Sequence, residues 1–359
     1  MSDFFEIDFL DVESKKSGDA IPIRYSIDGV IRIHIIDGGF QDTGDKIIDH
    51  INTYYDNPST IDAVIVSHSD GDHAGGLQKV LETFYVSELW MLRPWLYADE
   101  LIDRFPRWSN VENLVRRLKE IYPNIAALEE IAEAEEIPIF EPFQGAKIGE
   151  FIVLAPTKER YLDLVVESEK TPESTGEISQ SLLERGRTFV EKAVPLIKVA
   201  WGVEAFSPEE TSSENEMSVV QYANLCSKKI LLTADAGRGA LTEAANYAPW
   251  AGLALPGIDR FQVPHHGSRR NVSTEILDRW LGARLPEKLE EGGEKFIAII
   301  SASEGDKDHP RKAVIRACIH RGAQVISTEG TDICLWSEPT RENWTAISGL
   351  PYPEEQEED

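Results

Sequence analysis

Hydrophobic positions in the first 85 residues follow two periods, one typical of strands and one typical of helices. Runs rich in β-branched residues predict strands at residues 21–27, 30–36 and 63–68. Asp28 and Gly29 lie between the first two runs and predict a two-residue hairpin turn. Apolar residues at helical spacing predict helices over 43–55 and 77–84.

The same mixture of strands and helices returns later in the chain. Further strands are expected within 137–143, 151–156, 218–225, 228–237, 261–268 and 296–303, and a helix over 313–323. Two polar stretches, at about 87–138 and 159–214, are predicted as helical insertions. We therefore expect an α/β protein in which helices cover two sheets, as a single domain over 1–350. The acidic tail 351–359 is expected to be disordered.

The composition of the chain limits the classes of protein to which it can belong. A chain of 359 residues with 42% hydrophobic content can bury a large core. It has no apolar run long enough for a membrane span, and its acidic start is unlike a signal peptide. Three scattered cysteines fit a reducing cytoplasm. The formal net charge of −27 repels polyanions at long range, which restricts any hypothesis of nucleic-acid binding.

The segment 66–77 reads VSHSDGDHAGGL and places four potential metal ligands directly after a predicted strand. These are His68, Asp70, Asp72 and His73. Imidazole and carboxylate together suit Zn²⁺, Mn²⁺ or Fe²⁺. A calcium loop of the EF-hand type is excluded, because Ala74 and Leu81 stand where that loop needs ligands.

Three more polar clusters also follow predicted strands. Asp235 ends LLTADAG, His265 and His266 stand in VPHHGS, and His309 stands in GDKDHP. Adjacent side chains on a strand point to opposite faces, so only one of the paired histidines is expected to be a ligand if strand geometry persists. The other could donate a proton or fix a loop. Side chains at strand ends can converge on one site.

These motifs, taken in order, resemble those of a known protein superfamily. HSDGDH resembles the HxDxDH variant of the metallo-β-lactamase signature HxHxDH. Its succession by LLTADAG, VPHHGS and a histidine-proline turn is similar to the soluble domain of ComEC-type DNA-uptake proteins. FLDVESKKSGDA and IIDGG near the start support the likeness. The resemblance covers about two thirds of the chain.

The resemblance implies a four-layer αββα sandwich with two divalent metal ions, zinc or manganese, with magnesium possible. His68 and Asp70 would bind one ion. Asp72, His73 and one of the paired histidines, with His265 favoured, would bind the other, and Asp235 would bridge them. The sequence has no histidine between His73 and His265, where the wider superfamily usually supplies one, so the first ion would be held mostly by oxygen.

The function expected on this basis is that of a metal-dependent phosphodiesterase, in particular a nuclease. Asp72 would hold the attacking hydroxide, and His309 or His266 would protonate the leaving group. Four basic residues near the site are candidates for binding the substrate phosphate: Arg269, Arg270, Lys307 and Arg311. On so acidic a protein, we expect a nucleic-acid substrate that a partner delivers rather than duplex DNA taken directly from solution.

Two other interpretations stay open. The same metals could hydrolyse a carboxylic ester, thioester, lactone or small phosphoester, because one fold hosts many chemistries. Alternatively, the insertions, which carry Trp90, Trp95 and Trp108, could dock a protein partner and leave the metal site regulatory.

Overall fold

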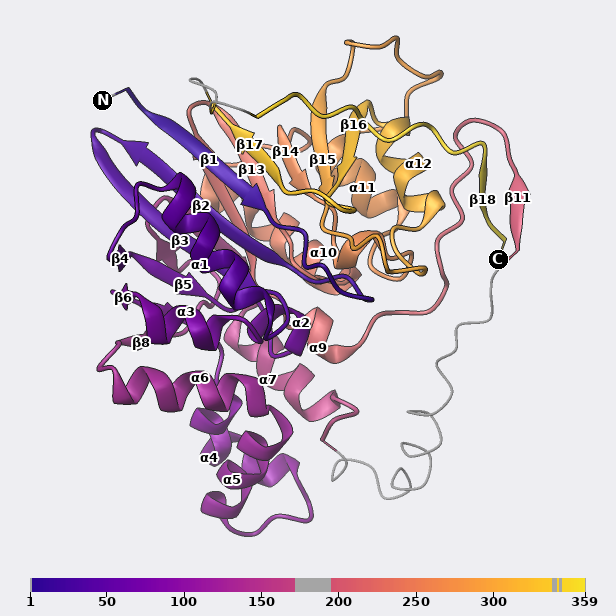
Figure 1. Cartoon of the computed structure of the whole chain (residues 1–359). Coiled ribbons are helices and arrows are strands. Elements are labelled where there is room, and N and C mark those ends of the chain that lie inside the picture. Colours follow the sequence, from indigo (N-terminus) through magenta and orange to yellow (C-terminus); the bar gives the residue numbers. More distant parts are fainter. Residues whose placement is uncertain (1, 172–194, 338–340, 342–343, 359) are drawn as a thin grey trace.

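Two seven-stranded sheets form the centre of the molecule in the computed structural model, which describes residues 2–171, 195–337, 341 and 344–358 (Figure 1). The first sheet runs in the order β17 (Ile333–Trp336), β1 (Phe4–Phe9), β2 (Ala20–Ile27), β3 (Val30–Gly38), β5 (Ala63–Ile65), β7 (Leu89–Trp90) and β8 (Ile139–Phe140). The second runs in the order β16 (Ala323–Ser327), β15 (Phe296–Ile300), β14 (Arg260–Gln262), β13 (Lys228–Leu232), β12 (Val220–Leu225), β10 (Phe151–Ala155) and β9 (Lys147–Ile148).

Each sheet has an antiparallel part and a parallel part. The pairs β3–β5, β5–β7 and β7–β8 are parallel in the first sheet, and β13 to β16 are parallel in the second. The remaining pairs within these sheets are antiparallel. Parallel strands present their carboxyl ends at one edge, and such edges are where side chains from several strands can meet.

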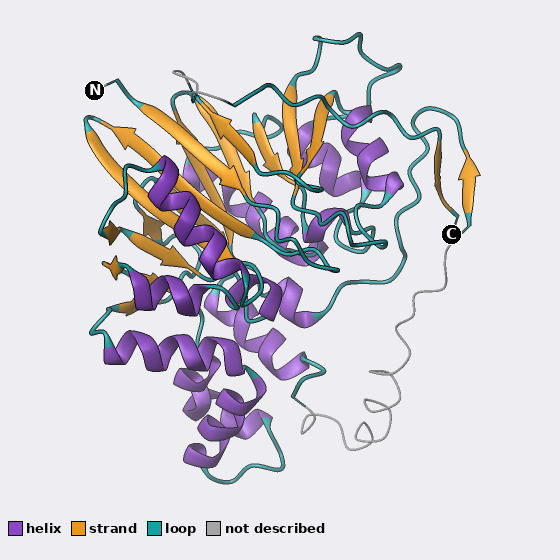
Figure 2. Cartoon of the chain, viewed as in Figure 1, coloured by secondary structure: helices purple, strands orange, loops and turns teal. Residues whose placement is uncertain are grey.

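Helices cover the outer faces of both sheets (Figure 2). On the first sheet these include α1 (Thr43–Tyr54), α3 (Leu77–Thr83) and α6 (Pro123–Ala134); on the second they are α10 (Arg238–Tyr247), α11 (Thr274–Leu281) and α12 (Lys312–His320). The other helices are α2 (Gly71–Ala74), α4 (Ala98–Leu101), α5 (Val111–Ile121), α7 (Lys158–Glu167) and α9 (Ser213–Glu216), with short 3-10 turns at Pro94–Tyr97, Ile102–Arg104, Ala248–Ala251 and His265–Gly267.

Alternation along the strands explains the layering. On β13, Ile230 and Leu232 belong to the hydrophobic cluster that includes the first sheet, whereas Leu231 belongs to the cluster under the helices of the second sheet. Neighbouring side chains therefore face opposite layers, as the pleat of a strand requires. The predicted αββα arrangement of two sheets between helical layers is confirmed. Within the described ranges, every helix is too short or too polar to traverse a lipid bilayer.

The first hairpin turn and the two insertions were predicted from local sequence patterns. The hairpin turn is confirmed, because Asp28 and Gly29 have φ values of 52° and 78°, as a two-residue turn of this kind needs. The stretch 87–138 is not entirely helical, since it opens with β7, a member of the first sheet. Residues 172–194 of the second insertion lie outside the described residues.

The prediction of a disordered tail is wrong. Glu355–Glu357 form β18, which pairs antiparallel with β11 (Leu196–Lys198) in a small sheet. The side chain of Glu357 is buried and accepts hydrogen bonds from the backbone N–H groups of Lys312 and Ala313 at 2.9 and 3.0 Å. These groups begin α12, whose N-terminal end favours a negative charge, so the acidic composition that suggested disorder here provides a helix cap. A further two-stranded sheet joins β4 (Thr60–Ile61) to β6 (Tyr85–Val86).

Candidate metal centre

The predicted site residues come from the carboxyl ends of parallel strands in both sheets. His68 follows β5 of the first sheet, and His73 lies on the short helix α2 just beyond it. Asp235 follows β13, and the paired histidines follow β14, both in the second sheet. The two halves of the site therefore face each other across the sandwich.

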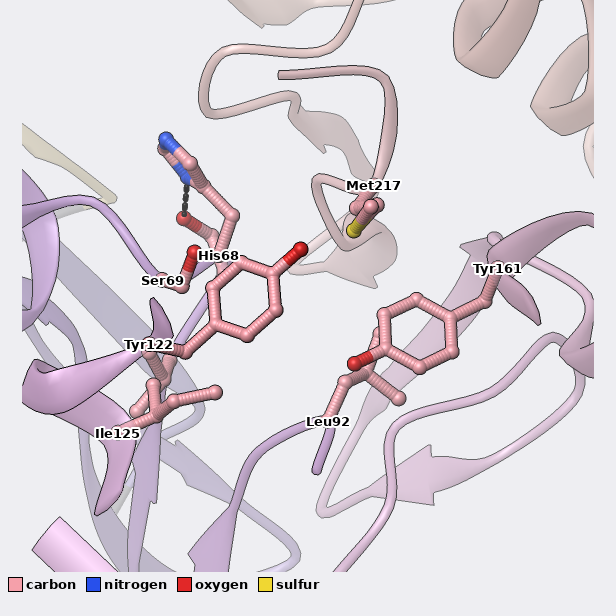
Figure 3. Close-up of a pocket in the computed structure, with 9 residues that line it drawn as sticks. His68, Ser69, Leu92, Tyr122, Ile125, Tyr161 and Met217 are labelled. Atoms are coloured by element: carbon pink, nitrogen blue, oxygen red, sulfur yellow. Dashed lines mark hydrogen bonds between the residues drawn. The ribbon is translucent and has the colours of Figure 1, made fainter. Parts of the chain in front are cut away.

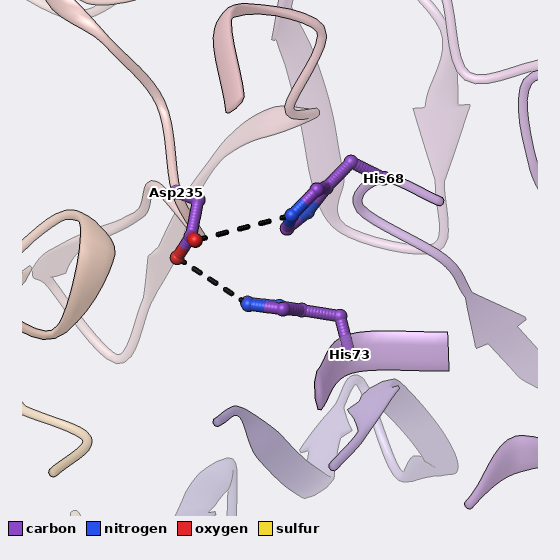
Figure 4. A group of neighbouring side chains, drawn as sticks. All are labelled: His68, His73 and Asp235. Atoms are coloured by element: carbon purple, nitrogen blue, oxygen red, sulfur yellow. Dashed lines mark ion pairs between the residues drawn. The ribbon is translucent and has the colours of Figure 1, made fainter. Parts of the chain in front are cut away.

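The carboxylate of Asp235 faces His68 and His73 (Figure 4), and both of the paired histidines also lie near it. The Oδ1 atom of Asp235 lies 3.3 Å from Nε2 of His73 and 3.7 Å from Nε2 of His266. Its Oδ2 atom lies 3.5 Å from Nε2 of His265 and 3.9 Å from Nε2 of His68. The structure thus brings four of the sequence-predicted imidazoles around the aspartate that was expected to bridge.

Both paired histidines face Asp235, although strand alternation would separate them. The strand has already ended: His265 and His266 lie in a 3-10 turn with φ values of 47° and 54°. This left-handed backbone conformation turns two successive side chains to the same side. The geometry on which the expectation depended does not persist at these positions.

The surroundings distinguish the two histidines. His266 is buried, and its Nδ1 donates to the carbonyl oxygen of Ser301 at 2.8 Å, which leaves Nε2 with a free lone pair. His265 is more exposed, and its Nδ1 contacts the side chains of Asn271 and Asn215 at 2.9 and 3.1 Å. In the described chain, some side chains offer three potential ligand atoms that lie within 4.8 Å of one another. These groups include His266 but not His265. The geometry favours His266 as the ligand.

Several buried polar atoms at the centre make no hydrogen bond within the described residues. They are Nε2 of His68, His73 and His266, and one carboxylate oxygen each of Asp19 and Asp235. Burying such atoms without partners is costly, and all are metal-ligand types. The donor set of imidazole nitrogen and carboxylate oxygen therefore fits a divalent cation such as Zn²⁺ or Mn²⁺.

The protonation states of the buried histidines and of Asp235 also suit cation binding. Burial and the neighbouring His73 lower the pKa of His68, and burial lowers the pKa of His266 to about 4, so both rings are neutral near pH 7. Burial opposes ionisation of Asp235, but the surrounding histidines hold its pKa well below the usual value. Asp235 and Asp37 outweigh burial and raise the pKa of His73, so a cation that binds there would displace its proton.

Two aspartates that sequence reasoning did not assign complete the centre. Asp37, at the end of β3, accepts hydrogen bonds from Nδ1 of His73 at 2.7 Å and from Oγ and the backbone N–H of Ser67 at 2.5 and 2.8 Å. Ser67 Oγ in turn accepts from Nδ1 of His68 at 3.0 Å. Asp37 thereby sets the tautomer of both histidines, directly and through Ser67, so that each Nε2 is available.

Asp19, the second of these, stands just before β2 in the segment SGDA. Its Oδ2 accepts from the side-chain amide of Gln262 at 2.9 Å, a hydrogen bond that joins the two sheets. Gly18 lets this segment approach the motif, since a Cβ there would lie 2.6 Å from the carbonyl oxygen of Asp72. Burial, with Asp235 and Asp37 nearby, raises the pKa of Asp19 to about 7. The sequence signal was available, because IIDGG and SGDA both place an aspartate at a strand terminus.

Asp70 is placed differently from the other motif residues. Its Oδ1 lies 2.5 Å from Nζ of Lys170, in the turn that follows α7. No close group of three potential ligand atoms in the described chain includes Asp70, whereas Asp72 groups with His73 and His266.

Beside the metal centre lies a cleft of about 340 Å³, whose lining includes Lys15, Lys16, Asp72, Lys307 and His309. We call it the lysine-lined cleft. His309 Nδ1 lies 3.3 Å from Oδ2 of Asp306, and its ring centroid lies 5.4 Å from that of His265.

Of the four predicted phosphate-binding residues, only Lys307 is among the residues that line this cleft in the described chain. Arg270 pairs with Glu209 at 2.5 Å, and Arg311 lies 3.4 Å from Asp308. Arg269 lies outside the cleft lining, with its carbonyl oxygen accepting from Ser207 and Arg238.

Comparison with known proteins shows a likeness over the part of the chain that carries the first motif. Residues 30–142 match the model of the metallo-beta-lactamase superfamily. This range contains β3, the HSDGDH motif and β8, so this part of the chain is similar to the metallo-beta-lactamase superfamily. The match is to the superfamily as a whole. A search of curated proteins gives no match.

Solved structures show weaker likenesses. One, titled hydrolase AbOPH in beta lactamase superfamily, has 12% identity and a TM-score of 0.29; another, titled AidC, a dizinc quorum-quenching lactonase, has 12% identity and a TM-score of 0.30. Each alignment covers 60% of this chain and 56% of the other, so the chain spans little over half of those proteins. A structure titled as a putative metallo-beta-lactamase from Thermotoga maritima has 10% identity and a TM-score of 0.22, over 46% of this chain and 81% of its own.

Proposed function

We propose that the protein is a metal-dependent hydrolase whose substrate is a phosphodiester, such as a short single strand of nucleic acid. The observation that carries the proposal is the lysine-lined cleft. Lys15, Lys16 and Lys307 line it, and none has an ion-pair partner among the described residues. The lining also includes Asp72, Asp306 and Asp308, of which Asp306 lies beside His309. On a protein of net charge −27, the three lysines beside the candidate metal centre offer an anionic substrate local positive charge.

The residues around the cleft suit this chemistry. A divalent cation bound at the centre would lower the pKa of a water molecule and polarise the phosphoryl group. Asp72 lines the cleft and is positioned to orient that water, and His309, held by Asp306, is positioned to protonate the leaving oxygen. The lysines would bind the remaining phosphate oxygens. The order of motifs, which resembles ComEC-type domains, supports the same substrate class.

A carboxylic ester, thioester or lactone is the alternative substrate, and one observation speaks to it. A pocket beside His68 is lined by Leu92, Tyr122, Tyr161 and Met217, and an apolar acyl group could use such a lining (Figure 3). Its volume of about 20 Å³ accommodates little more than one water molecule, so it cannot hold an acyl chain as it stands. The geometry favours the anionic substrate.

Docking of a protein partner through the insertions is the non-enzymatic alternative. Trp95 is buried and donates to Glu129 at 3.0 Å, and the Trp90 ring packs on Phe140 with centroids 5.0 Å apart. These tryptophans are engaged within the chain, so the aromatic side chains that suggested docking have an internal role. The metal centre is the better-supported seat of function.

Turnover of bis-p-nitrophenyl phosphate and of a single-stranded oligonucleotide, compared with p-nitrophenyl acetate, tests the proposal with Mn²⁺ or Zn²⁺ supplied. We expect hydrolysis of the phosphodiesters and an approximately tenfold rise in their KM for Lys16→Met, since a hydrogen bond to a charged group contributes about 1.5 kcal/mol or more. Lys147→Met, at an exposed lysine on β9, is the matched control. Turnover of the acetate alone, insensitive to Lys16, would refute the phosphodiester assignment.

A further inference from the structure

The metal-ligand groups around Asp235 are not independent of one another. His73 belongs both to the group with His68 and Asp235 and to the group with Asp72 and His266. One Nε2 atom binds one ion, because its ring offers a single lone pair on that side. An ion held by His73, Asp72 and His266 therefore leaves the His68 side of the centre with two of the expected ligands, His68 and Asp235, and with Asp70 as the third.

Asp70 is already engaged by a cation. The ammonium of Lys170 lies 2.5 Å from its Oδ1 atom. Asp70 precedes α2, yet its side chain makes no capping hydrogen bond there, so the lysine is the partner that the structure gives it. A dication on the same carboxylate would be placed against a positive charge at close range, which Coulomb repulsion opposes.

Lys170 is held in this position by a buried turn. Its backbone N–H donates to Oγ of Ser168 at 3.0 Å, and Ser168 Oγ bonds to the carboxylate of Glu214. Thr171 Oγ1 donates to the carbonyl oxygens of Ser168 at 2.6 Å and of Val165 at 3.1 Å. Ser168 and Thr171 are each 1% exposed. The lysine thus starts from a fixed backbone, unlike an ordinary surface lysine.

We propose that this chain binds one divalent cation, between Asp72, His73, Asp235 and His266, and that the Lys170 ammonium occupies the place of a second cation beside His68 and Asp70. The inference rests on the proposed metal-dependent function and departs from the dinuclear centre that the sequence motif implies. The centre would then carry two sources of positive charge, the bound ion and the Lys170 ammonium that pairs with Asp70. The lysine cannot activate water, so that role falls to the single ion.

Metal stoichiometry of the full chain tests this without reference to activity. Elemental analysis after dialysis, together with calorimetric titration of the metal-free protein with Mn²⁺ and with Zn²⁺, should give one ion per chain, with a second bound at least a hundredfold more weakly. Lys170→Met removes the charge and keeps the length of the side chain, and should tighten the second ion tenfold or more. Lys170→Arg should retain one ion, and Lys147→Met should match the parent protein.

The outcomes separate this inference from the proposed function. Two ions bound to the parent protein with affinities within tenfold of each other would overturn the inference and leave the hydrolase proposal standing. Absence of any bound ion would overturn both. One ion in both the parent and Lys170→Met, with the second no tighter, would overturn the role of the lysine. If Lys170→Met fails to fold, the parent protein and Lys170→Arg still decide the stoichiometry.

Discussion

Asp37→Asn changes one oxygen to an amide nitrogen at the residue that orients two candidate ligands. Oδ2 of Asp37 accepts from both His73 and Ser67, and Oδ1 accepts from the backbone of Ser67. An asparagine amide can present its oxygen to only one side. If its NH₂ group faces His73, that ring must accept through Nδ1 and carry its proton on Nε2, which can then no longer bind a cation. If it faces the Ser67 N–H, two donors oppose each other in a buried place.

The size of the effect depends on the hydrogen bonds that the asparagine cannot make. Partners of this kind behind a metal ligand typically contribute 10- to 100-fold in metal affinity, or about 1.4–2.8 kcal/mol. We expect Asp37→Asn to weaken cation binding by an amount in that range. Ser67→Ala keeps the bond from His73 to Asp37 and removes only the connection to His68, which lies outside the proposed single-ion site, so it should weaken binding less than tenfold.

Calorimetric titration of the metal-free protein, or competition with a chromophoric chelator, measures the effect directly. Asp99→Asn, at an exposed carboxylate on α4, changes charge identically at a distant place and is the matched control. Circular dichroism confirms that each variant is folded. Affinity for Mn²⁺ and Zn²⁺ within twofold of the parent in Asp37→Asn would refute the argument that this carboxylate sets the tautomers.

Other predictions concern stability. Glu357→Gln should lower the free energy of unfolding by about 1 kcal/mol in urea titrations, because the buried carboxylate caps α12; an unchanged midpoint would contradict this. Burial opposes ionisation of Glu204, but hydrogen bonds from His320 and Arg321 lower its pKa to about 2 from 4.5. Its stabilisation, about 3 kcal/mol, should be complete above pH 4.5 and lost as pH falls through 2, and Glu204→Gln should flatten that profile. Chelation should lower the melting temperature, since an ion at a hundredfold its Kd stabilises by about 2.7 kcal/mol; equal melting curves with and without chelator would contradict a folded-state site.

Periodicity and turn chemistry predicted much of the fold. The alternating runs near the start became β2 and β3, the helical spacing at 43–55 became α1, and the glycine-rich end of the motif became the approach to α3. These features depend on residues near one another in sequence, and the local pattern therefore contains the information. The convergence of His68, His73, Asp235 and the paired histidines was also predictable, because each follows a buried strand.

What the sequence did not reveal depends on long-range contacts. Asp37 and His73 are 36 positions apart, and the bond between Asp19 and Gln262 spans 243 positions. Asp19 and Asp37 stand at strand termini, which is a weak signal, because an aspartate at such a place also has the local appearance of a turn former. The pairing of Lys170 with Asp70 spans 100 positions and comes from a stretch whose composition predicted only a polar insertion.

The division of the centre between two sheets has a mechanical consequence. Asp72 and His73 are anchored to one layer of the sandwich, and Asp235 and His266 to the other, so a coordinated ion would link the two layers. Separation of the layers would then release the ion. Loss of the ion would leave four polar groups facing one another, which would weaken the contact between the two layers. A substitution in the core far from the cleft could shift one sheet against the other by a fraction of an ångström. Its first measurable effect would then be a change in how tightly the protein retains the metal ion.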